Sequence, residues 1–133
     1  MVPVLGRAGT TTIDEVRAFT DAALSEKLAR VRAAEAKAGR PKGCVRFGST
    51  IFNYALTAAP EDTRAMAERL SILFKMSPEE VLKHPITLVG TPEEMADELQ
   101  RREQVHGLSL LAINFADLDQ IRDFGEKVLA KLR

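Results

Sequence analysis

Two short apolar runs constrain the fold of this chain more than any other feature of its sequence. Val45–Leu56 is rich in β-branched and aromatic residues, and apolar side chains occupy both of its alternating faces. Leu108–Phe115 (LSLLAINF) is a second, nearly continuous apolar run. Both patterns are typical of strands covered on both faces, as in parallel sheets. The sequence therefore predicts two buried strands, with a third, brief extended segment at Ile86–Val89.

Segments with helical spacing separate these strands. A helix is expected from Ile13 to Ala38, and the Thr20-Asp21 pair marks a point where it can break. Pro60 begins the next helix, because proline is favoured at the first helical position. The residues expected to face the core in this and the later helices are Ala67, Leu70, Leu73 and Phe74, then Met95, Ala96, Leu99 and Val105, then Ile121, Phe124, Val128 and Leu132.

Helix start signals recur along the chain. Thr12 and Glu15 have the spacing of a capping box, and the pattern hydroxyl-Pro-Glu-Glu occurs at Ser77 and again at Thr91. Pro85 keeps the helix after Ser77 short. Gly107 is placed to end the helix after Thr91, and Asp117 to cap the last one.

The order of these elements predicts an α/β fold. Strands separated by helices of this length are normally parallel and joined by right-handed crossovers. We expect a single domain spanning 1–133, in which 1–12 form a loop or short strand and 13–133 form α/β units. Two parallel strands with apolar residues on both faces leave open edges. A homo-oligomer, or a further chain, is therefore expected to complete the sheet.

Charge and hydropathy exclude several partners. Lys and Arg (19) balance Asp and Glu (19), so no net field attracts nucleic acid or an anionic membrane. The most basic stretch, Arg30–Lys42, is interrupted by Glu35 and is expected to be a solvated helix face. No segment approaches the roughly 18 apolar residues of a membrane-spanning helix. We expect a soluble, cytoplasmic protein.

The sequence predicts no metal site. Cys44 is the only cysteine, which excludes an internal disulfide and a multi-cysteine zinc site; it is expected to be a small apolar residue at a strand entrance. His84 precedes Pro85 at a helix end, and His106 precedes Gly107, where a positive charge suits the helix dipole. Both histidines are expected to be structural, and two at such places do not make a metal site.

The segment Ser77–Ile121 (SPEEVLKHPITLVGTPEEMADELQRREQVHGLSLLAINFADLDQI) resembles the end of the barrel of luciferase-like, flavin- or deazaflavin-dependent oxidoreductases. Upstream, Gly9–Thr12 (GTTT) and Glu26–Ala34 (EKLARVRAA) are similar to an earlier segment of that family, so the resemblance covers almost the whole chain. It implies a partial (β/α)8 TIM barrel of the luciferase-like type, comprising its closing β/α units. It also implies FMN or a deazaflavin coenzyme as cofactor.

The chain departs from that family where most of the cofactor is held. Family members bind the ring at the ends of earlier strands and the phosphate tail through a preceding Gly-rich stretch, and neither is present. Gly6-Arg7-Ala8-Gly9 is too sparse for a phosphate cradle and is expected to be a turn. The isolated chain is therefore expected to bind the cofactor weakly or not at all.

The barrel resemblance places ligands at the carboxyl ends of the strands. That selects Tyr54 and Thr57 after the first strand, and Asn114, Phe115 and Asp117 after the last. Asn53 and Asn114 interrupt otherwise apolar strands, and their amides need partners, either a ligand or a neighbouring strand or loop. The candidate cofactor-binding residues are Asn53, Asn114 and Asp117, although Asp117 also serves as a helix cap. No catalytic residue stands out.

Three functional hypotheses follow. The chain is a truncated or split luciferase-like oxidoreductase, whose redox chemistry belongs to the cofactor and whose remaining part comes from a partner. Alternatively it is a non-catalytic half-barrel that self-associates as an assembly or binding module. The third hypothesis is a small stand-alone α/β binding protein.

Overall fold

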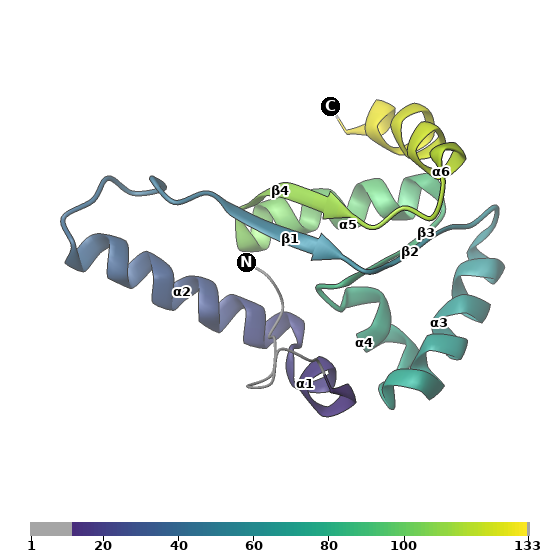
Figure 1. Ribbon diagram of the computed structural model, residues 1–133, viewed down its shortest axis with the longest axis horizontal. Coiled ribbons are helices and arrows are strands. Elements are labelled where there is room, and N and C mark those ends of the chain that lie inside the picture. Colours follow the sequence, from purple (N-terminus) through teal and green to yellow (C-terminus); the bar gives the residue numbers. More distant parts are fainter. Residues whose placement is uncertain (1–11, 133) are drawn as a thin grey trace.

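The computed structural model describes residues 12–132 and has a mixed α/β fold with parallel strand pairs (Figure 1). The loop or strand predicted for 1–12 and the turn at Gly6–Gly9 lie outside the described residues, Thr12 excepted. The elements, in chain order, are α1 (Ile13–Ala18), α2 (Asp21–Lys37), β1 (Phe47–Ile51), β2 (Asn53–Leu56), α3 (Pro60–Phe74), α4 (Pro78–Lys83), β3 (Thr87–Gly90), α5 (Pro92–His106), β4 (Leu108–Ile113), α6 (Leu118–Asp123), a π-helical turn η1 (Phe124–Val128) and a 3-10 turn η2 (Leu129–Lys131). No helix among these is long and apolar enough to cross a membrane.

The predicted helix boundaries are confirmed at their caps. The first helix does break at Thr20, whose hydroxyl accepts a hydrogen bond from the Ala23 N–H and so starts α2. The capping boxes at Thr12, Ser77 and Thr91 are all formed. Gly107 ends α5 with a φ of 67°, in the left-handed region where a side chain would be strained.

The strand predicted over Val45–Leu56 is two strands. β1 pairs in parallel with β4, whereas β2 pairs in parallel with β3. At the junction, the N–H groups of both Phe52 and Asn53 donate to the carbonyl of Ile86, at 2.9 and 3.1 Å. Two residues opposite one carbonyl are the mark of a bulge, which bends the chain from one partner to the other. One extended segment thus forms the centre of the structure, with β4 on one side and β3 on the other.

The expectation that β4 is covered on both faces is wrong for the described residues. Leu110 is 50% exposed and Leu111 36% exposed. The physical reason is that β4 has a strand neighbour on one side only, and little packs over its faces. In a closed (β/α)8 barrel each strand pairs with the strand before it and the strand after it in the sequence. Here β3 pairs with β2, but β4 pairs with β1 rather than with β3.

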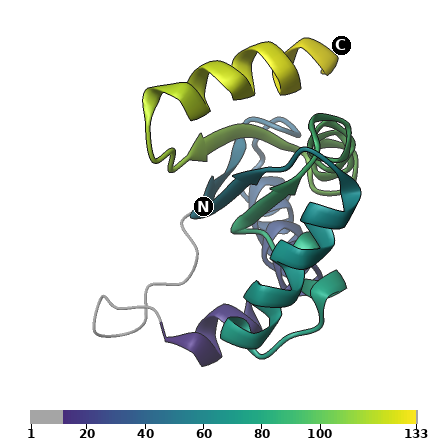
Figure 2. The same ribbon diagram turned by 90° about the vertical axis from the view of Figure 1, so that its right-hand side faces the viewer.

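Two apolar clusters hold the strands against the helices. The first joins α2 to the amino-terminal ends of the strands and contains Phe19, Leu24, Leu28, Phe47, Ile86 and Leu108. The second joins α5 and the C-terminal helical stretch to the strands and contains Ile51, Leu88, Met95, Phe124 and Val128. In Figure 2, the strands lie between this C-terminal stretch on one side and α1 with α3 on the other.

Three apolar residues expected to face the core are exposed. They are Leu73, Val105 and Ile121. In α5 the buried positions of the last turns are instead taken by Arg102 and His106, because a buried hydrogen-bond network rather than an apolar layer joins this end of the helix to its neighbours. Helical spacing alone does not distinguish these two kinds of contact.

Arg102 is the centre of that network and is 2% exposed. Its guanidinium donates to the carbonyls of His84 (3.1 Å), Pro85 (3.3 Å) and Thr87 (2.7 Å), and its Nε donates to Glu98 at 2.7 Å. Five fixed donors suit such a set of carbonyl acceptors. The turn that leads into β3 is thereby fixed to α5.

The stretch Arg30–Lys42 is not the uniformly solvated face that was expected. Glu35 is only 4% exposed, because its carboxylate accepts hydrogen bonds from Arg32 (2.8 Å) and from the Val45 N–H (2.7 Å). The Arg32 guanidinium also lies 4.0 Å from the centre of the Phe47 ring. Cys44 is exposed and donates its Sγ–H to Glu35 at 3.2 Å, so it is not an apolar residue at the strand entrance. These bonds fix the loop that leads into β1.

The Glu35 contacts predict a pH-dependent contribution to stability. The hydrogen bond from Arg32, followed by that from Val45, lowers the pKa of Glu35 from 4.5 to about 2. Because the folded-state pKa lies below the unfolded one, the contribution is complete above pH 4.5 and is lost as the pH falls towards 2. We expect Glu35→Gln to flatten the decline in the free energy of unfolding over that range, measured by urea denaturation. Equal slopes for the variant and the wild type would contradict this.

Candidate functional site

An open pocket of about 490 Å³ lies at the carboxyl end of β2. Its walls come from the end of β2 and the residues that follow it, the first residue of α5, and the α6–η1 stretch. The lining residues are Tyr54, Ala55, Leu56, Thr57, Ala58, Pro92, Gln120, Asp123 and Lys127. The volume is within the range of small-molecule sites, and carboxyl ends of parallel strands are where α/β proteins bind ligands.

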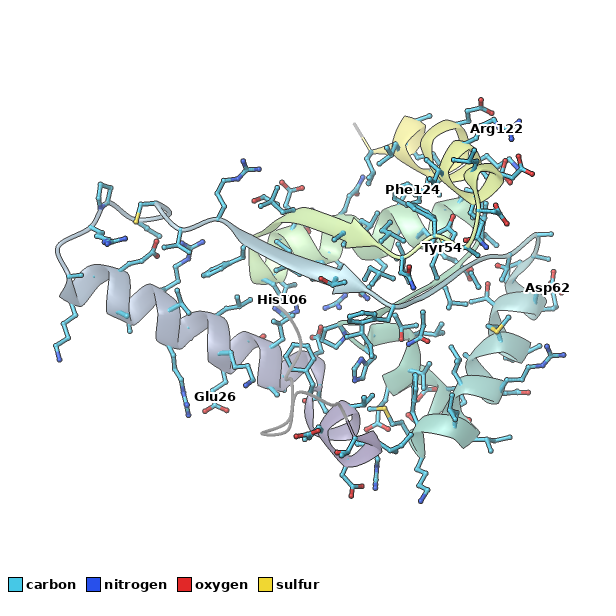
Figure 3. All side chains as sticks on the ribbon, in the orientation of Figure 1. Glu26, Tyr54, Asp62, His106, Arg122 and Phe124 are labelled. Carbon is cyan, nitrogen blue, oxygen red and sulfur yellow. The ribbon has the colours of Figure 1, made fainter. Side chains whose placement is uncertain are left out.

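Tyr54 lines this pocket and has a hydroxyl group that makes no hydrogen bond within the described residues. Its hydroxyl is buried and has no partner among residues 12–132. The ring is held edge-on by Phe115, at 4.9 Å between centres, and by Phe124, at 5.9 Å; Figure 3 shows Tyr54 and Phe124 side by side. A buried hydroxyl without a partner costs roughly 1–3 kcal/mol. The aromatic contacts keep this side chain in place despite that cost.

The electrostatic surroundings keep the Tyr54 hydroxyl protonated. Burial, followed by the negative charge of Asp123, raises the pKa of Tyr54 above its ordinary value. The Asp123 carboxylate is itself paired with Lys127, whose Nζ lies 2.9 Å away. The pocket therefore offers a neutral phenol that donates, next to a paired carboxylate and ammonium.

A chain of hydroxyl groups connects the pocket to Glu94. Thr63 donates to the Glu94 carboxylate at 2.7 Å, and the Thr57 and Thr63 oxygens are also 2.7 Å apart. A hydroxyl has one proton. Because the proton of Thr63 goes to Glu94, Thr57 must donate to Thr63. Towards any other group, the Thr57 oxygen can then only accept a hydrogen bond.

The same Glu94 oxygen also accepts from the N–H of Thr91, within the capping box of α5. Gly90 lies directly against this carboxylate: a Cβ at position 90 would lie 2.9 Å from the Glu94 Cβ. A side chain there would displace Glu94. Glycine at the end of β3 thus permits the network that joins β2, α3 and α5.

The sequence-predicted residues do not form one site. Asn53 is half-buried at the start of β2, and its neighbour Tyr54 points to the opposite face of the strand. Asn114 is exposed, and its backbone N–H donates to Ile51. Asp117 is exposed and caps α6 by accepting from the Gln120 N–H at 2.9 Å. Of the residues expected at the strand ends, Tyr54 and Phe115 are in contact, and Thr57 lines the same pocket as Tyr54.

The side chains of the two histidines bond to different partners. His84 accepts from the Ile86 N–H through Nδ1 and donates from Nε2 to the Val16 carbonyl at 2.8 Å. Burial lowers the pKa of His84. The bond to Val16 raises it, and the nearby charge of Arg102 lowers it, so the overall shift is downward. This histidine is therefore a neutral link between α1 and the turn before β3.

His106 joins α2 to the end of α5. Its Nε2 lies 2.8 Å from Asp21 and its Nδ1 lies 3.2 Å from the Ser25 hydroxyl; the side chain is labelled in Figure 3. Burial alone raises the pKa of Asp21, but the hydrogen bonds and charges of Arg101 and His106 lower it below its ordinary value. The order serine, histidine, aspartate resembles a hydrolytic triad. However, Ser25 lies inside α2, where backbone N–H groups bond within the helix and form no oxyanion hole.

Sequence reasoning missed Thr63, Glu94, Asp123 and Lys127. Glu94 was recognised only as the third residue of a capping box, which it is. The Asp123-Lys127 spacing is that of an ordinary helical ion pair. No signal in the sequence relates these residues to Tyr54, because the pocket depends on how the C-terminal stretch packs. Among residues 12–132, no group of three His, Cys, Asp or Glu side chains could hold a metal ion.

The hydroxyl chain predicts a stability effect at Thr63. Thr63→Val keeps the shape of the side chain but removes the hydrogen bonds to Thr57 and Glu94, so we expect it to lower the free energy of unfolding by about 1–3 kcal/mol. The matched control is Thr87→Val, since the Thr87 hydroxyl is buried without a partner among the described residues. That control should be neutral or stabilising in urea denaturation. A Thr63→Val loss no larger than that of the control would contradict the role of the chain.

Comparison of the chain with protein-family models, curated proteins and solved structures finds no match. The resemblance to luciferase-like oxidoreductases therefore depends on the order and spacing of the sequence segments, above all Ser77–Ile121. It stays a prediction.

Proposed function

We propose that this chain provides the closing β/α units of a luciferase-like, flavin- or deazaflavin-dependent oxidoreductase. Its share of the cofactor site is the pocket at the carboxyl end of β2. The observation that carries the proposal is Tyr54, which lines this pocket and whose buried hydroxyl has no partner in the described residues. The parallel strands joined by helices, and the segment Ser77–Ile121, support it.

The pocket fits part of such a cofactor. A flavin or deazaflavin ring carries carbonyl oxygens and ring nitrogens, which accept hydrogen bonds from a donor such as the Tyr54 phenol. The acceptor oxygen of Thr57 suits a ligand N–H or hydroxyl, and the flat ring of Tyr54 suits an aromatic ligand. When bound, the cofactor supplies the redox chemistry; the residues of this chain bind and orient it.

We propose that the rest of the site comes from another polypeptide, because the described residues supply only part of it. The pocket is open, and Lys127, the one cation among the described residues that line it, is already paired with Asp123. A phosphate tail needs several donors or cations. The exposed apolar faces of β4 indicate where a further polypeptide, a second copy or another chain, covers this one.

The second candidate function is that of a non-catalytic half-barrel that self-associates as an assembly or binding module. The observation that favours it is β4 itself. Among the described residues this strand has one unpaired edge, its leucines Leu110 and Leu111 are exposed, and it contains no charged residue. In that case the Tyr54 pocket has no cofactor to bind.

Titration of the chain with FMN and with a deazaflavin, followed by fluorescence polarisation, tests the proposal. We expect saturable binding that is weaker than about 1 µM, because the site is partial. Tyr54→Phe should weaken it by about threefold to tenfold, the effect of one hydrogen bond. Arg30→Gln, on the exposed face of α2, serves as the control and should leave binding unchanged.

Two results would contradict the proposal. Binding that Tyr54→Phe leaves unchanged, or no binding at all, would remove the pocket from the cofactor site. Tight, stoichiometric binding by a monomer would contradict the partial nature of the site.

A further inference from the structure

One edge of β4 has no strand partner among the described residues. Within the described residues β4 pairs only with β1, and its other side has no strand neighbour. Leu110 and Leu111 are adjacent in the strand, so their side chains lie on opposite faces, and both are exposed. Any polypeptide that pairs with this edge therefore gains main-chain hydrogen bonds and apolar cover on both faces.

A groove runs beside this edge. It has a volume of about 690 Å³ and lies between α5, β4 and the C-terminal helical stretch. Its apolar lining includes Leu99, Leu110, Ile113, Phe115, Phe124 and Leu129. Open apolar surface of this kind, next to an unpaired strand, is typical of a protein interface.

The opposite edge of the sheet is closed. All four residues of β3 are buried, and α3, α4 and α5 pack around the strand. The Thr87 carbonyl accepts from the buried Arg102. Because β3 is covered, a β4 edge from another copy cannot pair there. In a self-association of this chain, the open edge therefore cannot meet β3 of a second copy, whereas the same β4 edge of that copy is open to it.

The charge pattern favours such a second copy over other occupants. Residues 108–116 contain no charged side chain, and the whole chain has a net charge of zero. A charged peptide or nucleic acid would have its charges buried without partners at this edge. A second β4 brings only leucine, isoleucine, alanine and serine to the contact, so the strand is complementary to itself.

We propose that β4 pairs with β4 of a second copy, forming a two-fold symmetric dimer. In a contact between identical edges, each copy presents the same surface to the other. A two-fold axis then relates the two copies and makes their β4 strands antiparallel. Leu110 and Leu111 of each copy then cover those of the other on both faces. The inference rests on the proposed function only for the view that another polypeptide completes the sheet. It concerns the β4 edge alone and not the source of the rest of the cofactor site.

Light scattering on the full chain, over a range of micromolar concentrations, tests the pairing. We expect a dimer for the wild type. Leu110→Lys places a charge in both halves of the interface and removes two buried leucines per dimer, so it should weaken the dimer by about 100-fold. The matched control is Ile72→Lys on α3, since Ile72 is 80% exposed and lies away from β4. Circular dichroism checks that both variants are folded.

Cysteine cross-linking locates the contact without destabilising it. In a Cys44→Ser background, single cysteines at Ser109, Leu110, Leu111 and Ala112 report on the strand, and Ile72→Cys is the control. We expect an intermolecular disulfide from at least one position in β4 and none from the control. Disulfides from the control alone would overturn the inference, as would a wild-type monomer or a dimer that Leu110→Lys leaves intact.

The two proposals fail separately. A β4-paired dimer that binds neither FMN nor a deazaflavin would support this inference and contradict the proposed function. A monomer whose weak flavin binding depends on Tyr54 would contradict this inference and support the proposed function.

Discussion

The structure depends on one buried cation, the guanidinium of Arg102. It holds three carbonyls of the turn before β3 and the carboxylate of Glu98. Glu98 in turn binds Arg101, which reaches Asp21 at the start of α2. Burial alone raises the pKa of Glu98, but Arg101 and Arg102 lower it below its ordinary value, so the carboxylate stays charged. Removing one partner of such a buried pair costs about 3–5 kcal/mol, since the other charge is left unpaired.

This network explains why β3 is covered and β4 is not. Polar contacts from α5 close the structure around β3 and the start of α2, whereas β4 stays exposed over most of its length although α5 contacts it. Strand β4 follows α5 after a single glycine, Gly107, so its position is fixed by the end of that helix. The outcome is a central extended segment with one closed side and one open side. Both functional proposals depend on that asymmetry.

Local signals were sufficient to predict most of the secondary structure. Thr12, Thr20, Ser77, Thr91 and Asp117 all cap helices, because capping is a contact between residues two or three positions apart. The parallel α/β class also follows from the order of elements. The bulge at Phe52 could not be predicted, because it exists only where one segment changes partners between β3 and β4.

Exposure and site geometry were harder to predict, since they depend on long-range packing. The apolar pattern of Leu108–Phe115 is the same whether the strand is covered by its own chain or by another one, and the structure leaves it exposed. The structure does not bring Asn53, Asn114 and Asp117 together in one site, and their assignment to the cofactor stays a prediction. Thr57 was placed correctly after a strand, whereas Tyr54 lies within β2. Thr63 and Asp123 come from helices that the strand pattern does not include.

Amide hydrogen exchange along β4 tests the central claim, that another polypeptide completes the sheet at this edge. In a parallel ladder with one neighbour, every second N–H of a strand points away from its partner and exchanges freely. If a second strand pairs with the open edge, all amides from Ser109 to Ile113 are protected at high protein concentration. On dilution, the amides that point away from β1 lose this protection. Alternating protection at every concentration would contradict the account.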